Sequence, residues 1–215
     1  MCAFTATAKG SDIEPIPEGI HIATCYALYD MGTTYDERWK KSVHKLLICW
    51  EIPSIRIEVE RDGKQVDLPR AISKRYTLSL NSKANLRKDL EAWRGQAFTA
   101  AELEGFDLRT ILGASCQLQV LHTKKDDGGT WANVQTIMGL PAGLPAPDQE
   151  NPKTCFAFEE GAELPEGCPE WVQKIIMGSD EWIAAHGAPA PADAPNDPGP
   201  PSGTEDPPEE DNLPF

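Results

Sequence analysis

The chain has 215 residues and a formal net charge of −14, from 34 acidic and 20 basic side chains. Its size admits one ordinary domain or two small ones. So large an excess of acid would normally argue against nucleic-acid binding, because affinity there comes largely from Lys and Arg that neutralise phosphates. The excess is uneven, however: residues 1–140 carry 18 basic and 18 acidic side chains, and residues 141–215 carry 2 and 16. The first part is therefore a body with no net charge, and its charge does not exclude nucleic-acid binding. It is joined to an acidic appendage.

No signature points to catalysis, a metal or a membrane. The sequence has no phosphate-binding loop, no GxSxG, no HExxH and no paired metal-ligand motif, and its four His residues are scattered singly. The six Cys show no CxxC pair and no zinc-like spacing, and several lie in apolar runs typical of buried, reduced thiols. There is no signal stretch and no run long enough to span a bilayer. These features predict a soluble protein of a reducing cytoplasm, without enzymatic activity, cofactor or metal.

The first 80 residues are rich in β-forming runs. After a flexible lead-in over 1–17, three strands are expected, the first of them strongly bent, at 20–29, 43–52 and 71–80. A polar loop at 32–41 joins the first two strands, and Pro53 is expected to stop the second. An Asp-Gly pair at 62–63 predicts a hairpin turn inside a small β insertion over 55–70.

A helix and two further strands complete the body. The helix is expected over 83–94, capped by Asn81 or Ser82, with one apolar face formed by Leu86, Leu90 and Trp93. Thr99 and Glu102 form a capping box for a short second helix, and two paired strands follow at 115–123 and 130–138. Three strands, a helix and two strands is the order of the OB fold. We therefore predict a mainly β domain over 18–140, a five-stranded OB-fold barrel with the helix between strands three and four.

The acidic part divides in two. Residues 141–186 read as a linker followed by short helical segments at 169–176 and 179–186, whose Trp and Ile side chains are expected to pack back on the barrel. From Gly187 onward there are nine Pro, seven acids and no base in 29 residues, which predicts a disordered tail over 187–215.

An OB barrel binds single strands with a basic groove and aromatic platforms on which bases stack. The binding face lies on strands two and three, between the loops that join strands one to two and four to five. Cations interleave with aromatics at each of these places, which gives a set of candidate DNA-binding residues: Tyr35, Arg38, Trp39, Lys40, Lys41, Lys74, Arg75, Tyr76, Lys124, Lys125 and Trp131. Three alternatives stay open. Tyr76 could point inward, because strand residues alternate faces. Trp131 could cap the barrel, and Trp39 could belong to an ordinary solvated loop.

The tail ends in Asp211, Asn212, Leu213, Pro214 and Phe215. An acidic run closed by an apolar residue, Pro and a terminal Phe resembles the tip of bacterial-type single-stranded-DNA-binding proteins, and the resemblance implies docking on replication or repair enzymes. In such docking the Phe ring can fill an apolar pocket of the partner, while the α-carboxylate of the terminal residue pairs with a basic residue at the rim of the pocket. A tail that only improves solubility would gain nothing from that Phe.

A second resemblance lies in the body. Residues 74–95, followed by Gly-Phe-Asp-Leu at 105–108, look like small proteins from the early regions of tailed phages and prophages. This resemblance covers about residues 15–140 and implies single-stranded DNA binding in phage replication or recombination. Two other functions stay open: an OB-fold interaction adaptor that binds no DNA, and a strand-annealing or recombination-mediator protein. The sequence leaves the oligomeric state undecided.

The division of charge yields a first prediction. Removal of residues 187–215 is expected to tighten binding of single-stranded DNA, most clearly at low salt, because the acidic tail competes with DNA for the basic groove. Oligo-dT titrations of full-length and truncated protein over a salt series measure the effect. Equal or weaker affinity after truncation would contradict it.

Overall fold

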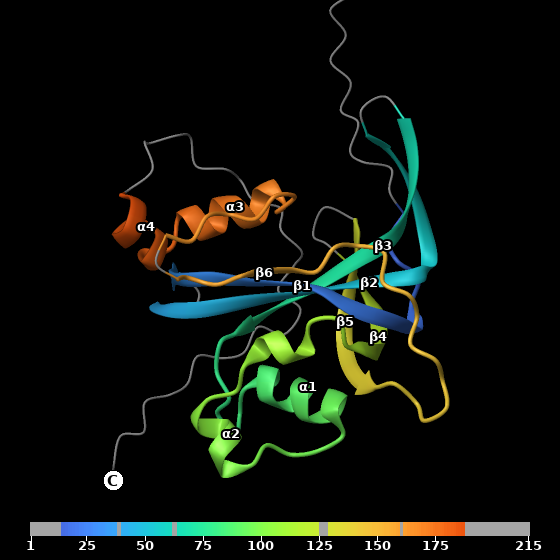
Figure 1. Ribbon diagram of the computed structural model, residues 1–215, viewed down its shortest axis with the longest axis horizontal. Coiled ribbons are helices and arrows are strands. Elements are labelled where there is room, and N and C mark those ends of the chain that lie inside the picture. The colour runs from blue at the N-terminus through green and yellow to red at the C-terminus, as the bar shows by residue number, and fades with distance from the viewer. Residues whose placement is uncertain (1–13, 38–39, 62–63, 125–128, 160, 188–215) are drawn as a thin grey trace, which may run out of the picture.

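One mainly antiparallel sheet is the centre of the described structure. The computed structural model describes residues 14–37, 40–61, 64–124, 129–159 and 161–187, and its main strands follow the order β3-β2-β1-β4-β5 (Figure 1). These strands are β1 (Gly19–Asp36), β2 (Lys41–Arg61), β3 (Lys64–Thr77), β4 (Ser115–Lys124) and β5 (Thr130–Gly139). A short sixth strand, β6 (Thr154–Phe156), pairs in parallel with β1 and was not predicted.

The sheet is curled without being closed. Its edge strands β3 and β5 approach each other, and no ladder of hydrogen bonds joins them in the described part of the chain. Helix α1 (Asn85–Arg94) lies against both edges. The mainly β class predicted from the sequence is confirmed, and the observed architecture is an open, curled antiparallel sheet with few helices.

β1 is longer than predicted, and two bulges interrupt it. Bulges between Cys25 and Ala27 and between Asp30 and Gly32 interrupt its ladder with β2, and bulges bend a strand and increase its twist. The first third of β1 therefore pairs with β4, from Gly19 opposite Val120, while the rest pairs with β2 as far as Asp36. The predicted loop at 32–41 was wrong over 32–36, because the strand continues past its second bulge.

β2 and β3 form one long hairpin that projects beyond the rest of the sheet (Figure 1). Pro53 was expected to end the second strand, but β2 runs on to Arg61. A register shift between Ile52 and Arg56 interrupts the ladder around this proline. Because proline has no N–H group, it can lie at such an interruption without the loss of a ladder hydrogen bond. The insertion predicted at 55–70 is thus the outer part of this hairpin, and its Asp-Gly turn lies outside the described residues.

The helices between β3 and β4 agree closely with those predicted from the sequence. α1 buries Leu86, Leu90 and Trp93 as predicted, but its N-cap is Ala84 rather than Asn81 or Ser82. The capping box at Thr99 and Glu102 is confirmed and opens α2 (Ala100–Glu104). A short 3-10 helix, η1 (Leu108–Ile111), then leads to β4.

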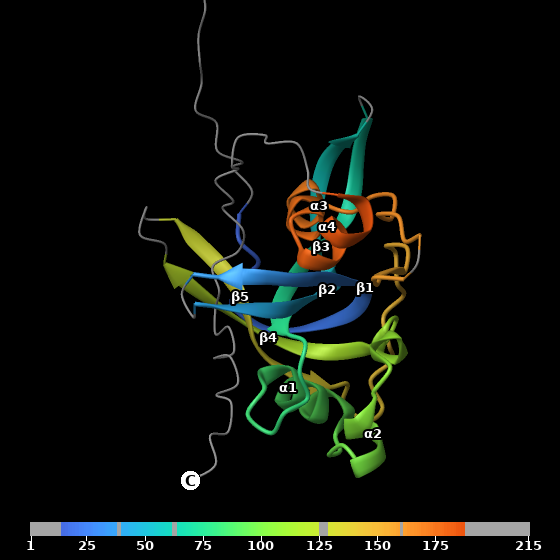
Figure 2. The ribbon, with the colours of Figure 1, turned by 90° about the vertical axis from the view of Figure 1, so that its left-hand side faces the viewer.

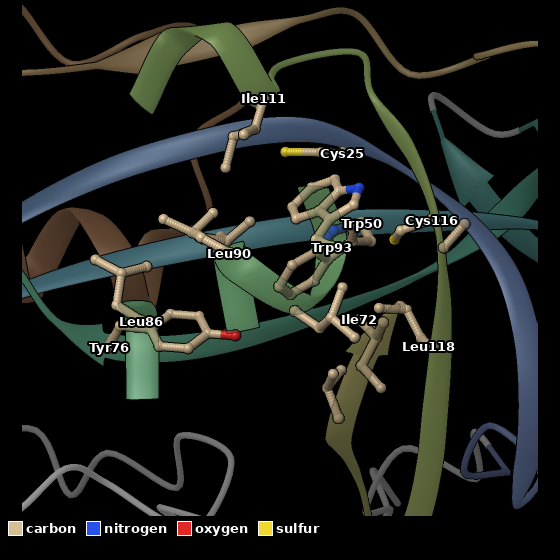
Figure 3. Close-up of a cluster of buried hydrophobic side chains, with 14 of the residues drawn as sticks. Cys25, Trp50, Ile72, Tyr76, Leu86, Leu90, Trp93, Ile111, Cys116 and Leu118 are labelled. Atoms are coloured by element: carbon tan, nitrogen blue, oxygen red, sulfur yellow. The ribbon is translucent and has the colours of Figure 1, made fainter. Parts of the chain in front are cut away.

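The main core fills the concave side of the sheet (Figure 3). Trp50 of β2 and Trp93 of α1 stand 6.0 Å apart between ring centroids, and the Trp93 indole N–H donates to the carbonyl of Ser115 at 3.1 Å. The Trp93 ring is thereby held between α1 and the start of β4. Around this pair lie Cys25, Ile72, Tyr76, Leu86, Leu90, Ile111, Cys116 and Leu118.

A second core lies on the opposite, outer face of β1 and β2. Helix α3 (Glu170–Met177) and helix α4 (Asp180–His186) follow β6 and lie across the sheet from α1 (Figures 1 and 2). Val172 and Ile176 of α3 are fully buried, together with Leu47 of β2 and Ala27 of β1. Trp171, Ile175 and Trp182 pack against this cluster, so the C-terminal segment packs back on the sheet as predicted from its Trp and Ile residues.

A buried carboxylate fixes the linker between β5 and β6. Glu51 of β2 is completely buried and accepts hydrogen bonds from the backbone N–H groups of Glu150 and Asn151, at 2.7 and 2.8 Å, and from the Asn151 side-chain amide at 2.6 Å. Three donors of the linker thus depend on one side chain.

Loss of this carboxylate is expected to destabilise the fold. Glu51→Ala leaves three part-buried donors without their acceptor, which costs about 3 kcal/mol of unfolding free energy. Glu58→Ala, at an exposed position of the same strand, is the matched control and should cost less than about 0.5 kcal/mol. Urea denaturation followed by tryptophan fluorescence measures both, and similar midpoints for the two variants would show that Glu51 does not fix the linker.

Candidate nucleic-acid interface

The end of the β1–β2 hairpin carries the first group of predicted residues. Tyr35 is 57 % exposed, and Lys40 is exposed with a φ of 51°, a left-handed conformation that is uncommon outside glycine and marks the turn into β2. Lys41 follows at the start of β2 and is half-buried. Arg38 and Trp39 were predicted here as well and lie outside the described residues.

The β4–β5 connection carries the second group. Lys124, at the end of β4, is exposed, and Trp131, near the start of β5, is half-buried. The predicted Lys125 lies outside the described residues. Figure 2 shows the β1–β2 and β4–β5 hairpins ending on the same side of the molecule, so the fold brings these two cation-bearing connections to one side.

Two of the predicted DNA-binding residues on β3 point inward, toward the core. Tyr76 is 3 % exposed and Lys74 is 8 % exposed, because both share the inward parity of Ile72 in the core. The carboxylate of Asp89 on α1 receives the Lys74 ammonium at 2.7 Å and the Tyr76 hydroxyl at 2.8 Å. The prediction that Lys74 and Tyr76 contact DNA is therefore wrong for this conformation, in which both bind α1.

Residues of the opposite parity on β2 and β3 point to the outer face of the sheet, which the second core largely covers. Leu47 and Cys49 of β2 point outward but lie in the second core, at 0 and 5 % exposure. Their neighbours on β3, Arg75 and Ser73, are half-buried. The predicted binding face on strands two and three is thus reduced to a strip along β3 and the start of β2.

This strip carries two cations. The Arg75 guanidinium lies over the indole of Trp171 from α3, 5.0 Å from the ring centroid. Lys45 of β2, paired across the ladder with Thr77, holds an ion pair with Asp36 at 3.0 Å. Sequence reasoning assigned Trp171 to packing alone, and nothing in the sequence indicated that it would meet Arg75.

A polar clasp fixes α4 to the β1–β2 hairpin. Glu181 of α4 accepts hydrogen bonds from the backbone N–H and the hydroxyl of Thr33, both at 2.6 Å. His44 stands between two carboxylates, with its Nε2 2.6 Å from Asp30 and its Nδ1 3.5 Å from Glu181. Gly32 admits the helix end, since a Cβ there would come within 2.5 Å of Ser179 Cβ. The sequence showed His44 only as an isolated histidine.

The clasp shifts the protonation of its members. The hydrogen bond to Asp30 raises the pKa of His44 above its ordinary value, more than burial lowers it, and the charges of Asp30 and Glu181 add to the rise. Burial alone would raise the pKa of Glu181, but the hydrogen bonds from Thr33 and from the Glu181 backbone, together with the charge of His44, outweigh it and leave that pKa lowered. Both shifts favour a charged His44–Glu181 pair.

The described residues offer little other chemistry. No group of three His, Cys, Asp or Glu among them is placed to hold a metal ion, and no helix within the described ranges is long and apolar enough to cross a membrane. Burial raises the pKa of Cys25 to about 12 and that of Cys168 to about 11, so these thiols stay protonated and weakly reactive near neutral pH. Comparisons with models of protein families, with curated proteins and with solved structures found no match to the chain.

The clasp makes stability depend on pH. A histidine whose pKa is higher in the folded than in the unfolded chain stabilises fully below its unfolded pKa, about 6.5, and loses that contribution as pH rises through the folded value. The stability difference between wild type and His44→Gln is therefore expected to shrink as pH rises from 6 to 9. Urea denaturation at several pH values measures it, and a difference independent of pH would show that His44 is not protonated in the clasp.

Proposed function

We propose that this protein binds single-stranded DNA without sequence preference. The observation that carries the proposal is that both connections flanking the curled sheet present lysine together with an aromatic ring. Tyr35, near the end of β1, lies beside Lys40 of the first connection, and Lys124, at the end of β4, and Trp131, near the start of β5, flank the second. Aromatic platforms beside a positive groove bind bases and phosphates of any sequence.

The strand arrangement supports an OB-fold barrel as the scaffold. In that fold β1 pairs with β2 and β4, a helix stands between strands three and four, and β3 meets β5 to close the barrel. The chain has this order, α1 stands in this place, and β3 approaches β5 without a ladder. Together with the resemblance of residues 74–95 to early-region phage proteins, this favours a role in phage DNA replication or recombination.

The acidic tail fits the same proposal. Its tip, Asp211–Phe215, lies outside the described residues, and its resemblance to the tips of bacterial single-stranded-DNA-binding proteins supports recruitment of replication or repair enzymes. The body would then hold the strand while the tail holds the enzyme. An interaction adaptor would use the same fold without DNA, and a strand-annealing protein would also speed pairing of complementary strands.

Oligo-dT binding at low salt tests the proposal. Wild type is expected to bind with quenching of its tryptophan fluorescence, and Tyr35→Ala to bind about 5- to 100-fold more weakly through loss of one stacked base. Lys124→Ala is expected to lower the slope of log affinity against log salt by about one phosphate contact. Lys88→Ala, an exposed lysine on α1, is the matched control and should leave the slope unchanged.

The other functions give distinct outcomes. An interaction adaptor predicts no quenching by oligo-dT even at low salt, which would reject DNA binding. A strand-annealing protein predicts the same binding together with faster pairing of complementary oligonucleotides, which a parallel annealing assay detects.

A further inference from the structure

The outer part of the β2–β3 hairpin, residues 56–61 and 64–70, forms an arm that projects beyond the rest of the sheet (Figure 1). The ladder runs along β3 without a bulge on that strand, so every second residue of β3 lies on the face that carries Ile72 in the main core. Partners across an antiparallel ladder share a face. The residues on this inner face of the arm are therefore Ile57, Val59, Lys64, Val66, Leu68 and Arg70.

The two faces of the arm differ in charge. Among its described residues, the inner face has two cations, four half-buried aliphatic side chains and no acid. The opposite face carries the exposed acids Glu58 and Asp67. On that face Arg56 pairs with Asp67 and with Glu150 of the linker between β5 and β6. The linker thus borders the acidic face of the arm, and the positive charge lies on the other face.

Both cations of the inner face are open to a ligand. Lys64 is exposed. Arg70 is half-buried, but no hydrogen bond or ion pair engages it within the described part of the chain. None of its guanidinium nitrogens is buried without a partner, so these nitrogens reach solvent. Burial lowers the pKa of Arg70, and no neighbouring acid opposes that shift, although a guanidinium stays charged near neutral pH. Arg70 is therefore a positive charge without a counter-charge.

The inner face is close to the second group of candidate DNA-binding residues. The arm and the β4–β5 hairpin project to the same side of the sheet in both views (Figures 1 and 2), and β3 contacts β5 directly. The inner face of the arm also continues the face of β3 that packs in the main core with β4 and β5. It therefore lies on the side of the arm toward the hairpin that carries Lys124 and Trp131.

The chemistry of this face suits a single strand of nucleic acid. Lys and Arg side chains without a counter-charge pair with phosphates, the absence of acid avoids repulsion, and two-stranded β-ribbons contact DNA in other proteins. The usual path across the outer face of strands two and three is largely covered here by the second core. A strand that reaches Lys124 and Trp131 thus meets open cations on the arm and not on the outer face.

We infer that the inner face of the arm is a further contact surface for single-stranded DNA, on which Lys64 and Arg70 each pair with a phosphate and the aliphatic side chains pack against the strand. The strand then passes from the β4–β5 connection onto the arm, and the acidic face of the arm points away from it. This inference rests on the proposed function, and it gives the β2–β3 hairpin a role that the sequence did not indicate.

Substitutions that change net charge equally on opposite faces of the arm test the inference. Lys64→Gln removes one positive charge from the inner face, and Gln65→Glu adds one negative charge to the exposed opposite face. In oligo-dT titrations of the full-length protein at about 50 mM salt, Lys64→Gln and Arg70→Gln are each expected to bind about 5- to 10-fold more weakly, with the slope of log affinity against log salt lowered by about 0.7. Gln65→Glu is expected to stay within about twofold of wild type, because it touches no phosphate and salt screens its field.

The outcomes separate this contact from the proposed function. Thermal unfolding shows whether each variant keeps its fold, and the exposed Lys64 provides the test even where Arg70→Gln destabilises the arm. Equal weakening by Lys64→Gln and Gln65→Glu would assign the effect to net charge and overturn the contact. Unchanged oligo-dT binding by Lys64→Gln and Arg70→Gln, with lost binding of a peptide of residues 205–215, would assign the arm to the acidic tail; in either case the proposed function stands. Failure of wild type to bind oligo-dT would reject both.

Discussion

Burial of β2 on both faces is the constraint on which the rest of the structure depends. Leu46, Ile48 and Trp50 point into the main core, and Leu47 and Cys49 point into the second. An antiparallel sheet commonly leaves one face to solvent, but the segment Leu46–Trp50 of this strand is buried on both faces. The chain must therefore provide a layer on each side, and it does so with α1 on one side and with β6, α3 and α4 on the other. The C-terminal segment is for this reason part of the fold rather than an addition to it.

This double burial also decides where a ligand could bind. An OB-type sheet would expose the outer face of its second and third strands to a nucleic acid, and here the second core occupies the β1–β2 part of that face. On the strip that remains along β3, Arg75 and Lys45 are held by Trp171 and Asp36, so the ends of the two hairpins that carry Tyr35 and Lys124 are more open to a ligand. The surface open to a ligand therefore depends on the segment after residue 154.

Buried and part-buried polar side chains determine how the outer layer sits on the sheet. Glu51 holds the linker by accepting three hydrogen bonds, and His44 with Asp30 and Glu181 holds α4 by charge and hydrogen bonds. Asp89 acts similarly on the opposite side, where it binds Lys74 and Tyr76 to α1. Polar groups buried in this way fix orientation more than they add stability, because their desolvation offsets much of what each interaction contributes.

The sequence by itself determined the succession of strands and helices along the chain, the apolar face of α1, the capping box at Thr99 and the division of charge. Each of these depends on residues that are close together in the chain. It also contained an unused signal: the unbroken apolar run Leu46–Trp50 is typical of a strand buried on both faces. Only the tertiary structure decided which face of β3 carries Tyr76, that His44 meets two carboxylates, and that Trp171 meets Arg75. These contacts join residues far apart in the chain, and the bulges in β1 that set their register depend on how β2, β4 and α4 pack around it. Local residue patterns carry no information about such long-range contacts.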